Sequence, residues 1–241
     1  NSSVGMDALA KRLYDYDTIK FEDVVKKGQT FGDVPLENAA KYASEDAWIT
    51  LKFYKTFQNT LDKNLLAFAD THEFPFILTL FDMEQNGIKI NEAKMQKLIL
   101  ENDTKLKALT SEIYELSGEN FNINSVKQLG VILFEHLKLP TKKKTKTGYS
   151  TDESVLAELI DAHPVIEKIL AYRELYKLQS TYCEPLLALA KKDEGSRIYT
   201  SFLQTGTSTG RLSSKNPNLQ NIPARGSLAK DVRECFEARE G

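Results

Sequence analysis

Cysteine and tryptophan are scarce in this chain, whose 241 residues include two cysteines and one tryptophan. Cys183 and Cys235 lie far apart in the sequence and make no pair with the spacing of metal ligands. So few cysteines exclude a small secreted scaffold held by disulfides, and they fit a protein of the reducing cytoplasm.

Long apolar runs are also missing. The longest, FPFILTLF at residues 74–81, contains Pro75 and Thr79 and is far shorter than the ~20 residues of a membrane span. The first residues, NSSVGMDALAKR, lack the basic stretch and apolar core of a signal peptide. With 41% hydrophobic and 27% charged residues, the composition predicts a soluble protein with one large domain or two smaller ones.

The net charge is only −2, but its distribution is uneven. Residues 121–150 hold six lysines against one glutamate, and residues 197–233 hold six basic residues against one aspartate, a net of +5 in each segment. The rest of the chain therefore carries −12. Such segregation is typical of a polyanion-binding face on an acidic body. A lysine-rich loop such as KKKTK is equally common as a solvated turn.

The stretch from Thr209 to Arg225, TGRLSSKNPNLQNIPAR, combines arginine with a row of amides in an otherwise nearly uncharged, turn-rich sequence. Amide side chains offer both a donor and an acceptor, and arginine presents a rigid fork of donors. Because the minor groove shows acceptors at similar places on all base pairs, such donors suit a double helix of any sequence. Composition alone favours the plainer interpretation, a polar surface loop.

Apolar spacing and end signals predict helices at 6–16, 35–57, 74–85, 92–116, 125–137, 151–162 and 164–190. For helix 35–57 we expect Asp33 as the cap and one buried stripe, formed by Leu36, Ala40, Ala43, Ala47, Leu51 and Tyr54. Asn86-Gly87 ends the third helix, Asn91 caps the fourth, and Ser150 with Glu153 forms a capping box for helix 151–162.

Helices 92–116 and 164–190 are predicted to pack as a long antiparallel hairpin, because the first carries a narrow apolar stripe suited to one partner. At 1.5 Å per residue its rod is roughly 35–40 Å long. The two short helices and the lysine-rich loop then lie at the far tip. Residues 88–90 and the alternating segment 197–205 predict short strands. The expected fold class is mainly α with a small α+β part.

Tyr42 and Asp46 stand four residues apart and project from one helical face. By itself the pair means little, because a solvated aspartate beside a half-buried tyrosine is common. Glu45 points about 100° away from Asp46 and is expected to be a bystander.

The stretch 209–225 closely resembles the segment before the first catalytic carboxylate motif of family A DNA polymerases, the bacterial DNA polymerase I group. The resemblance implies that Arg211, Asn218, Gln220 and Asn221 contact primer–template DNA near the primer terminus, and that Arg225 lies near the incoming nucleotide. The helical hairpin resembles the polymerase thumb, whose candidate phosphate contacts are Lys127, Lys142, Lys143, Lys144 and Lys146.

Residues from MDALAKRL through KYASEDA resemble the end of the 3′–5′ proofreading exonuclease domain, whose last motif is Tyr-x-x-x-Asp. The resemblance implies that Asp46 ligates a metal ion and that Tyr42 orients the attacking water. It divides the chain into an exonuclease remnant (1–64), a connecting helix (65–90), the thumb (91–190) and the first palm strands (191–241).

The resemblance implies a parent enzyme that transfers nucleotidyl groups from dNTPs to a primer 3′ end with two magnesium ions, in replication and repair synthesis in the bacterial nucleoid. We expect a monomer that binds duplex DNA and no membrane. One aspartate does not hold two metal ions, and the palm aspartates are absent, so we expect this chain to bind no metal and to be inactive alone. Two other hypotheses stay open, a stand-alone DNA-binding module and a helical scaffold with incidental basic patches.

Overall fold

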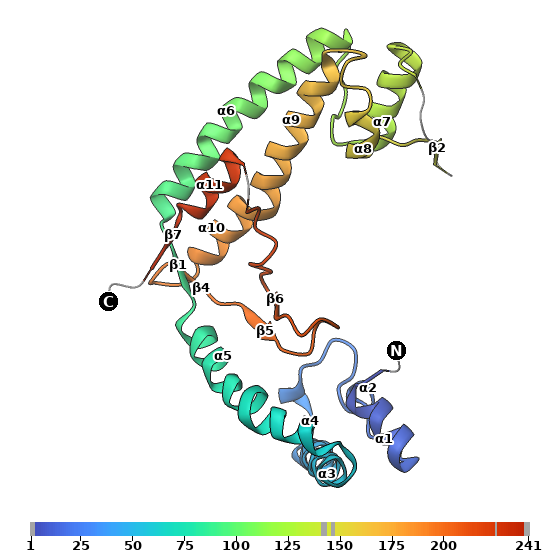
Figure 1. Cartoon of the computed structure of the whole chain (residues 1–241), viewed down its shortest axis with the longest axis vertical. Helices are drawn as coiled ribbons and strands as arrows, with labels where there is room; N and C mark the ends of the chain where they lie inside the picture. Colours follow the sequence, from blue (N-terminus) through green and yellow to red (C-terminus); the bar gives the residue numbers. More distant parts are fainter. Residues whose placement is uncertain (1–2, 141–143, 146–147, 225, 239–241) are drawn as a thin grey trace. The chain divides into compact units, whose positions relative to one another are not determined.

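The computed structural model describes residues 3–140, 144–145, 148–224 and 226–238. The chain forms two compact units, residues 1–78 and 79–241, and each is described by itself. The elements are mostly helices with a few short strands, so the predicted fold class is confirmed (Figure 1). The predicted division into four parts stays a prediction.

The first unit contains α1 (Met6–Tyr14), α2 (Phe21–Val24), a 3-10 turn at Phe31–Asp33 and the long α3 (Leu36–Thr60). A further helical run follows, composed of α4 (Lys63–Phe68), a π-helical turn at Ala69–Glu73 and the start of α5 (Phe74–Asn86). The core of this unit is small, because only Ala10, Ile49 and Phe53 are buried in it, with α1 packed on α3.

The predicted buried stripe of α3 is wrong. Ile49 is 0% exposed and Phe53 is buried, whereas Leu36 is 85% exposed and Leu51 is exposed. Both faces of α3 carry apolar residues at helical spacing, and α1 covers the face with the larger side chains. The predicted stripe contains three alanines, which bury little area, so spacing alone selected the wrong face.

The predicted cap at Asp33 is also wrong. The Asp33 carboxylate accepts hydrogen bonds from the backbone nitrogen and the hydroxyl of Thr30, at 2.8 and 2.9 Å. It therefore closes a capping box on the 3-10 turn, and α3 begins after Pro35 with no side-chain cap. The Asp33 carboxylate therefore bonds to Thr30, at the start of its own 3-10 turn, instead of to the free N–H groups at the start of α3.

In the second unit, α6 (Glu92–Ser117) and α9 (Val165–Leu178) lie side by side as the predicted antiparallel hairpin (Figure 1). A π-helical turn at Gln179–Cys183 continues α9 into α10 (Glu184–Ala190). Helix α6 has the predicted cap, since Asn91 Oδ1 accepts from the Lys94 backbone nitrogen at 2.9 Å, and it ends at Gly118 with φ +74°. The predicted N-terminal cap and C-terminal glycine of α6 are therefore confirmed.

The far end of the hairpin holds α7 (Val126–Val131), a π-helical turn (Ile132–His136) and α8 (Glu153–Ala157). Between them β2 (Lys144–Thr145) pairs with β3 (Gly148–Tyr149), a small hairpin that the sequence did not predict. The predicted capping box of Ser150 and Glu153 does not form: α8 starts after Asp152, and the buried Ser150 donates to the Asp152 carboxylate at 2.8 Å. A contact between near neighbours displaced the expected cap.

A three-stranded antiparallel sheet lies at the base of the hairpin, with β1 (Ile88–Ile90) between β4 (Arg197–Ile198) and β7 (Phe236–Glu237). The predicted strand at 197–205 is two short strands, because β5 (Ser201–Leu203) pairs instead with β6 (Ser213–Lys215). Helix α11 (Ser227–Arg233) packs against α6 and α9.

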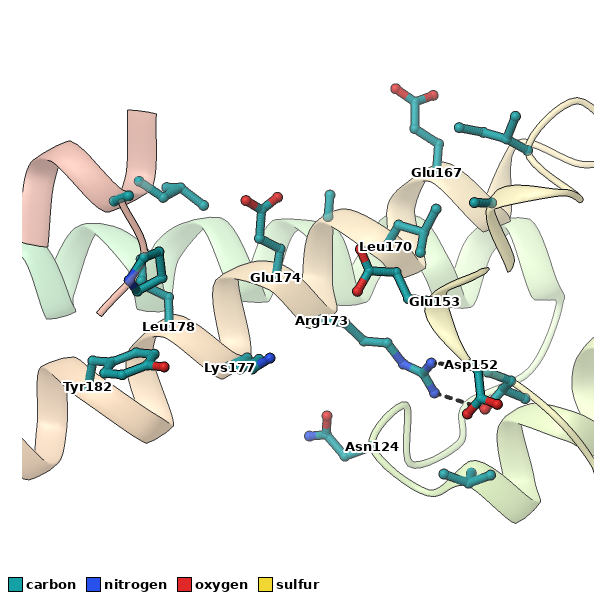
Figure 2. A pocket seen from close by; sticks show the side chains of 18 of the residues that line it. Asn124, Asp152, Glu153, Glu167, Leu170, Arg173, Glu174, Lys177, Leu178 and Tyr182 are labelled. Atoms are coloured by element: carbon teal, nitrogen blue, oxygen red, sulfur yellow. Dashed lines mark hydrogen bonds between the residues drawn. The ribbon is translucent and has the colours of Figure 1, made fainter. Parts of the chain in front are cut away.

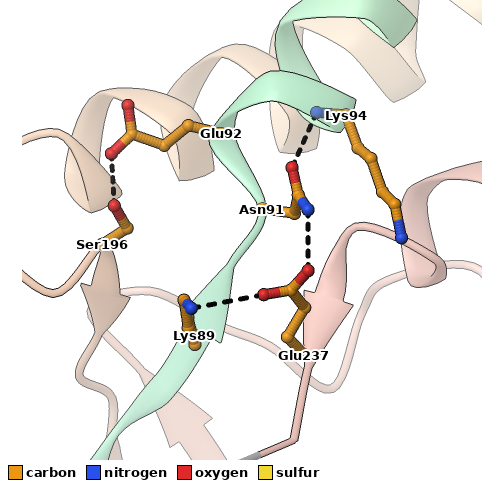
Figure 3. Close-up of polar contacts among 6 residues, drawn as sticks. All are labelled: Lys89, Asn91, Glu92, Lys94, Ser196 and Glu237. Carbon is orange, nitrogen blue, oxygen red and sulfur yellow. Dashed lines mark hydrogen bonds and ion pairs between the residues drawn. The ribbon is translucent and has the colours of Figure 1, made fainter.

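A polar clamp joins the first turn of α6 to β7 (Figure 3). Asn91 Nδ2 donates to Glu237 Oε1 at 2.7 Å, and Lys89 Nζ lies 3.4 Å from Glu237 Oε2. On the other side Ser196 donates to Glu92 at 2.5 Å. The Asn91 hydrogen bond, with Lys89, lowers the pKa of the Glu237 carboxyl below its ordinary value. The clamp fixes the direction in which α6 leaves the sheet.

Candidate nucleic-acid interface

The segment 209–224 forms an exposed, internally bonded loop around β6. The buried hydroxyl of Ser214 accepts from the Leu219 backbone nitrogen at 3.1 Å, and the buried Thr200 hydroxyl lies 2.7 Å from the Pro217 carbonyl. These two hydroxyls attach the loop to the β5–β6 sheet. The loop is therefore a positioned surface and does not merely connect two elements.

The four predicted DNA-contacting side chains of this loop, Arg211, Asn218, Gln220 and Asn221, are all exposed. Asn218 Oδ1 accepts from the Gln220 backbone nitrogen at 3.0 Å. The Nδ2 donors of Asn218 take no part in this hydrogen bond. Gln220 Nε2 donates to the Leu212 carbonyl at 3.0 Å. Among the described residues, none forms an ion pair with the Arg211 guanidinium. Each of the four is accessible to an external ligand.

A cavity of about 930 Å³ opens between α9, the tip of the hairpin and the residues Asn221, Pro223, Leu228 and Ala229 (Figure 2). Asn221 is the predicted site residue that lines it. Its backbone carbonyl accepts a hydrogen bond from the Tyr182 hydroxyl at 2.6 Å, which ties the loop to the rod. Arg211, Asn218 and Gln220 are not among the lining residues.

Helix α9 presents different charges on its two sides. In Figure 2, Glu167 and Glu174 point to one side of α9, whereas Arg173 and Lys177 point toward the opposite side, where Asn124 lies. Arg173 and Lys177 are four residues apart, so they share a face. Arg173, Lys177 and Asn124 thus lie on one wall of the cavity, away from Glu167 and Glu174. The cavity is also lined by the carboxylates of Asp152 and Glu153, which lie near Arg173.

Arg173 joins the rod to the tip. Its guanidinium donates to the Thr151 carbonyl in a short hydrogen bond and to the Thr151 hydroxyl at 3.1 Å. Burial lowers the pKa of the guanidinium, and the nearby Asp152 carboxylate opposes that effect. Asn124 Nδ2 donates to the Tyr172 hydroxyl at 3.2 Å from the same tip. These bonds fix the tip on α9.

Sequence reasoning missed the cavity residues Asn124, Thr151, Arg173, Lys177 and Tyr182. The i, i+4 spacing of Arg173 and Lys177 was a readable signal, but the helix also carries glutamates, which hid it. The predicted phosphate contact Lys127 is exposed on α7 and does not line the cavity. The backbone of Lys144 lies in β2, and Lys142, Lys143, Lys146 and Arg225 lie outside the described residues.

In the first unit, Tyr42 and Asp46 lie on the face of α3 that also carries Ile49. Burial, reinforced by the Asp46 carboxylate, raises the pKa of the Tyr42 hydroxyl. Asp46 Oδ1 is buried with no hydrogen-bond partner among the described residues. An orphaned carboxylate oxygen of this kind suits a cation ligand. However, the described residues contain no group of three or more His, Cys, Asp or Glu side chains able to hold a metal ion.

Two neighbours of this pair were not predicted as site residues. The exposed rings of Phe21 and Phe31 lie 6.3 and 6.0 Å from the ring of Tyr42, centre to centre. Glu45 accepts from the Tyr16 hydroxyl at 2.5 Å and from the Ile19 backbone nitrogen at 2.6 Å. Glu45 therefore holds the segment after α1 against α3.

The family model described as DNA polymerase family A matches residues 92–241, and the model described as 3′-5′ exonuclease matches residues 1–62. Because the first match covers more than half of the sequence, the chain belongs to DNA polymerase family A. This confirms the family expected from the stretch 209–225.

Relatives and a solved structure agree with this assignment. The chain is 46% identical to DNA polymerase I of Treponema pallidum, covering 98% of this chain and 24% of that protein. It is 39% identical to DNA polymerase I of Borreliella burgdorferi, covering 100% and 26%. The POL domain of Pol1 from M. smegmatis, in complex with DNA primer-template and dNTP, superposes with a TM-score of 0.75 at 30% identity, covering 100% and 39%. The chain thus spans about a quarter of the length of the curated relatives it matches.

None of the helices in the described ranges is long and apolar enough to cross a membrane.

Proposed function

We propose that this chain is the part of a bacterial DNA-directed DNA polymerase that grips primer–template duplex DNA during replication and repair synthesis. One observation carries the proposal: Lys177 of α9 and the donors of the loop 209–224 are exposed on one compact unit, and Asn221 lines the same cavity as Lys177. The relatives named above support it.

The grip would combine two kinds of contact. Lysines of the tip and Lys177 would meet phosphates, which fixes position without reading sequence. Arg211, Asn218, Gln220 and Asn221 would donate to acceptors in the minor groove. Since those acceptors recur on every base pair, the second set would hold the duplex whatever its sequence.

The proposed parent reaction is transfer of a nucleotidyl group from a dNTP to the primer 3′ end, with Arg225 near the nucleotide. Two magnesium ions held by the longer protein would stabilise the attacking and leaving oxygens. In the exonuclease part, the orphaned Asp46 oxygen would serve as one metal ligand and Tyr42 would orient a water. The parent would act as a monomer in the bacterial cytoplasm, at the nucleoid, with the parts 1–64, 65–90, 91–190 and 191–241.

The test is the salt dependence of duplex binding, measured by fluorescence anisotropy of a labelled primer–template. We expect binding at low salt, with log K falling linearly against log salt. Lys177→Ala should reduce that slope by about 0.9, the value for one phosphate contact. Arg211→Ala should weaken binding by roughly tenfold, since a good base-edge contact contributes about 1–3 kcal/mol.

The matched control is Lys97→Ala, an exposed lysine of α6, a helix that contributes nothing to the cavity. It should leave the affinity nearly unchanged. Absence of binding at low salt would overturn the proposal, and so would equal losses in all three variants.

A further inference from the structure

A polar layer divides the core of the helical hairpin. The distal apolar cluster includes Ile113 and Ile169, and the basal cluster includes Met95 and Leu98. On the buried face of α6, Asn102 stands between the two clusters, and it is 0% exposed. The hairpin therefore has two separate apolar cores instead of one continuous seam.

Gln179 lies at the same level on the opposite rod. Its Nε2 donates to Asp103 Oδ1 on α6 at 2.6 Å and to Glu184 Oε1 at 3.0 Å, and its side chain is 5% exposed. Among the described residues, Gln179 Oε1 and both polar side-chain atoms of Asn102 have no hydrogen-bond partner. Buried polar groups without partners destabilise the packed arrangement. Asn102, Asp103 and Gln179 are called the polar layer below.

The second rod is irregular at this same level. The π-helical turn runs from Gln179 to Cys183, and Pro185 follows two residues later. Proline has no N–H, and its ring clashes with the carbonyl four residues earlier, that of Thr181. Proline and π turns are the usual sites of helix kinks. The Ser180 hydroxyl also donates back to the Tyr176 carbonyl at 2.7 Å, a bond that favours bending.

We infer that the hairpin bends at the polar layer, so that the tip and the distal cluster move as one body relative to the basal cluster. In the packed state the Asn102 amide and the Gln179 Oε1 atom have no hydrogen-bond partner among the described residues. Bending admits water, which offers them donors and acceptors. These three unpaired polar atoms thus lower the free-energy difference between the packed and the bent state. The hinge would let the tip adjust to a bound duplex, and this use alone rests on the proposed function.

The hinge is tested without DNA by pulsed electron–electron resonance between spin labels at Glu158→Cys, near the tip, and Ala188→Cys, on α10. Both positions are exposed. The native thiols interfere little, since both are buried and burial raises the pKa of Cys183 to about 12. With the polar layer intact, the distance between the two spin labels should show a broad distribution. Asn102→Leu with Gln179→Leu should narrow it and slow amide exchange across residues 175–187 by about tenfold.

The control is Gln96→Leu, which adds an apolar side chain at an exposed site of α6 and should change neither readout. Pro185→Ala restores an N–H at the irregular turn and should narrow the distribution independently. If the double variant fails to fold, the proline variant decides the question. A folded variant with unchanged distances and exchange overturns the hinge. Because neither readout involves DNA, this failure is distinguishable from a failure of duplex binding.

Discussion

Arg173 offers the sharpest stability prediction in the second unit. Its guanidinium makes two hydrogen bonds to Thr151, which is 2% exposed. Arg173→Met keeps most of the aliphatic stem but removes both donors. Hydrogen bonds from a charged group contribute about 1.5–3 kcal/mol, and a buried carbonyl left unpaired costs about 1–3 kcal/mol. These terms overlap, because they describe the same lost contact. We therefore expect the free energy of unfolding of this unit to fall by about 2–4 kcal/mol.

The assay is urea unfolding followed by circular dichroism, with the midpoint and slope fitted for each variant. Glu174→Gln is the control, because this exposed neighbour lies on the other side of α9 and should change stability by less than about 0.5 kcal/mol. Duplex affinity should fall with Arg173→Met as well, since the tip loses its attachment to the rod. A loss of stability no greater than that of the control would refute the role assigned to Arg173.

Three further predictions concern separate parts of the chain. Gly87→Ala should lower the melting temperature and reduce the free energy of unfolding by about 2 kcal/mol or more. The backbone φ there is +56°, and the new methyl group would lie 2.7 Å from the Ile198 carbonyl oxygen. The control Gly5→Ala, whose methyl group would lie 3.6 Å from its nearest atom, should change stability little. The stabilising effect of Glu237 should be present above the ordinary carboxyl pKa and fade as the pH falls through its lowered value, so Glu237→Gln should flatten the acid limb of a stability–pH curve. If Glu237→Gln left the acid limb of the stability–pH curve unchanged, the stabilising role assigned to the clamp would be wrong. In the longer protein, Arg211→Ala should slow primer extension far more than Lys143→Ala, because alignment of the primer end carries much of the barrier reduction; equal losses would reverse that ranking.

Helix ends were predictable where the signal is local. Asn91 caps α6 and Gly118 ends it, as their positions indicated. Asn86-Gly87 ends α5 for the same reason, because a left-handed residue closes the last turn at little cost. These decisions involve residues within one helical turn of each other, so no distant part of the chain competes with them.

The errors occur where distant or competing partners decide. Which face of α3 is buried depends on α1, and periodicity cannot weigh two apolar faces against each other. Ser150 bonds to Asp152 instead of capping α8, since both arrangements satisfy the same hydroxyl. The π turn near Pro185 was hidden inside a pattern that reads as one uninterrupted helix.

The candidate interface was only half visible in the sequence. The donors of the loop 209–224 are contiguous, so the resemblance of that one stretch to the family could select them as a set, and the structure shows them exposed. The contribution of the rod was not. Tyr182, in the π-helical turn after α9, and Asn221 meet only through the fold, by a hydroxyl–carbonyl bond between segments far apart in the chain. Contiguous chemistry can be read from a sequence, whereas a cavity needs the tertiary structure.

The most direct test of the central claim compares the affinity of this chain for two primer–template duplexes of unrelated sequence and equal length, at one salt concentration. Contacts to phosphates and to shared minor-groove acceptors predict dissociation constants that agree within about twofold, and an equal loss on both duplexes in Arg211→Ala. A preference of tenfold or more for one sequence, or a loss with Arg211→Ala confined to one duplex, would contradict the account.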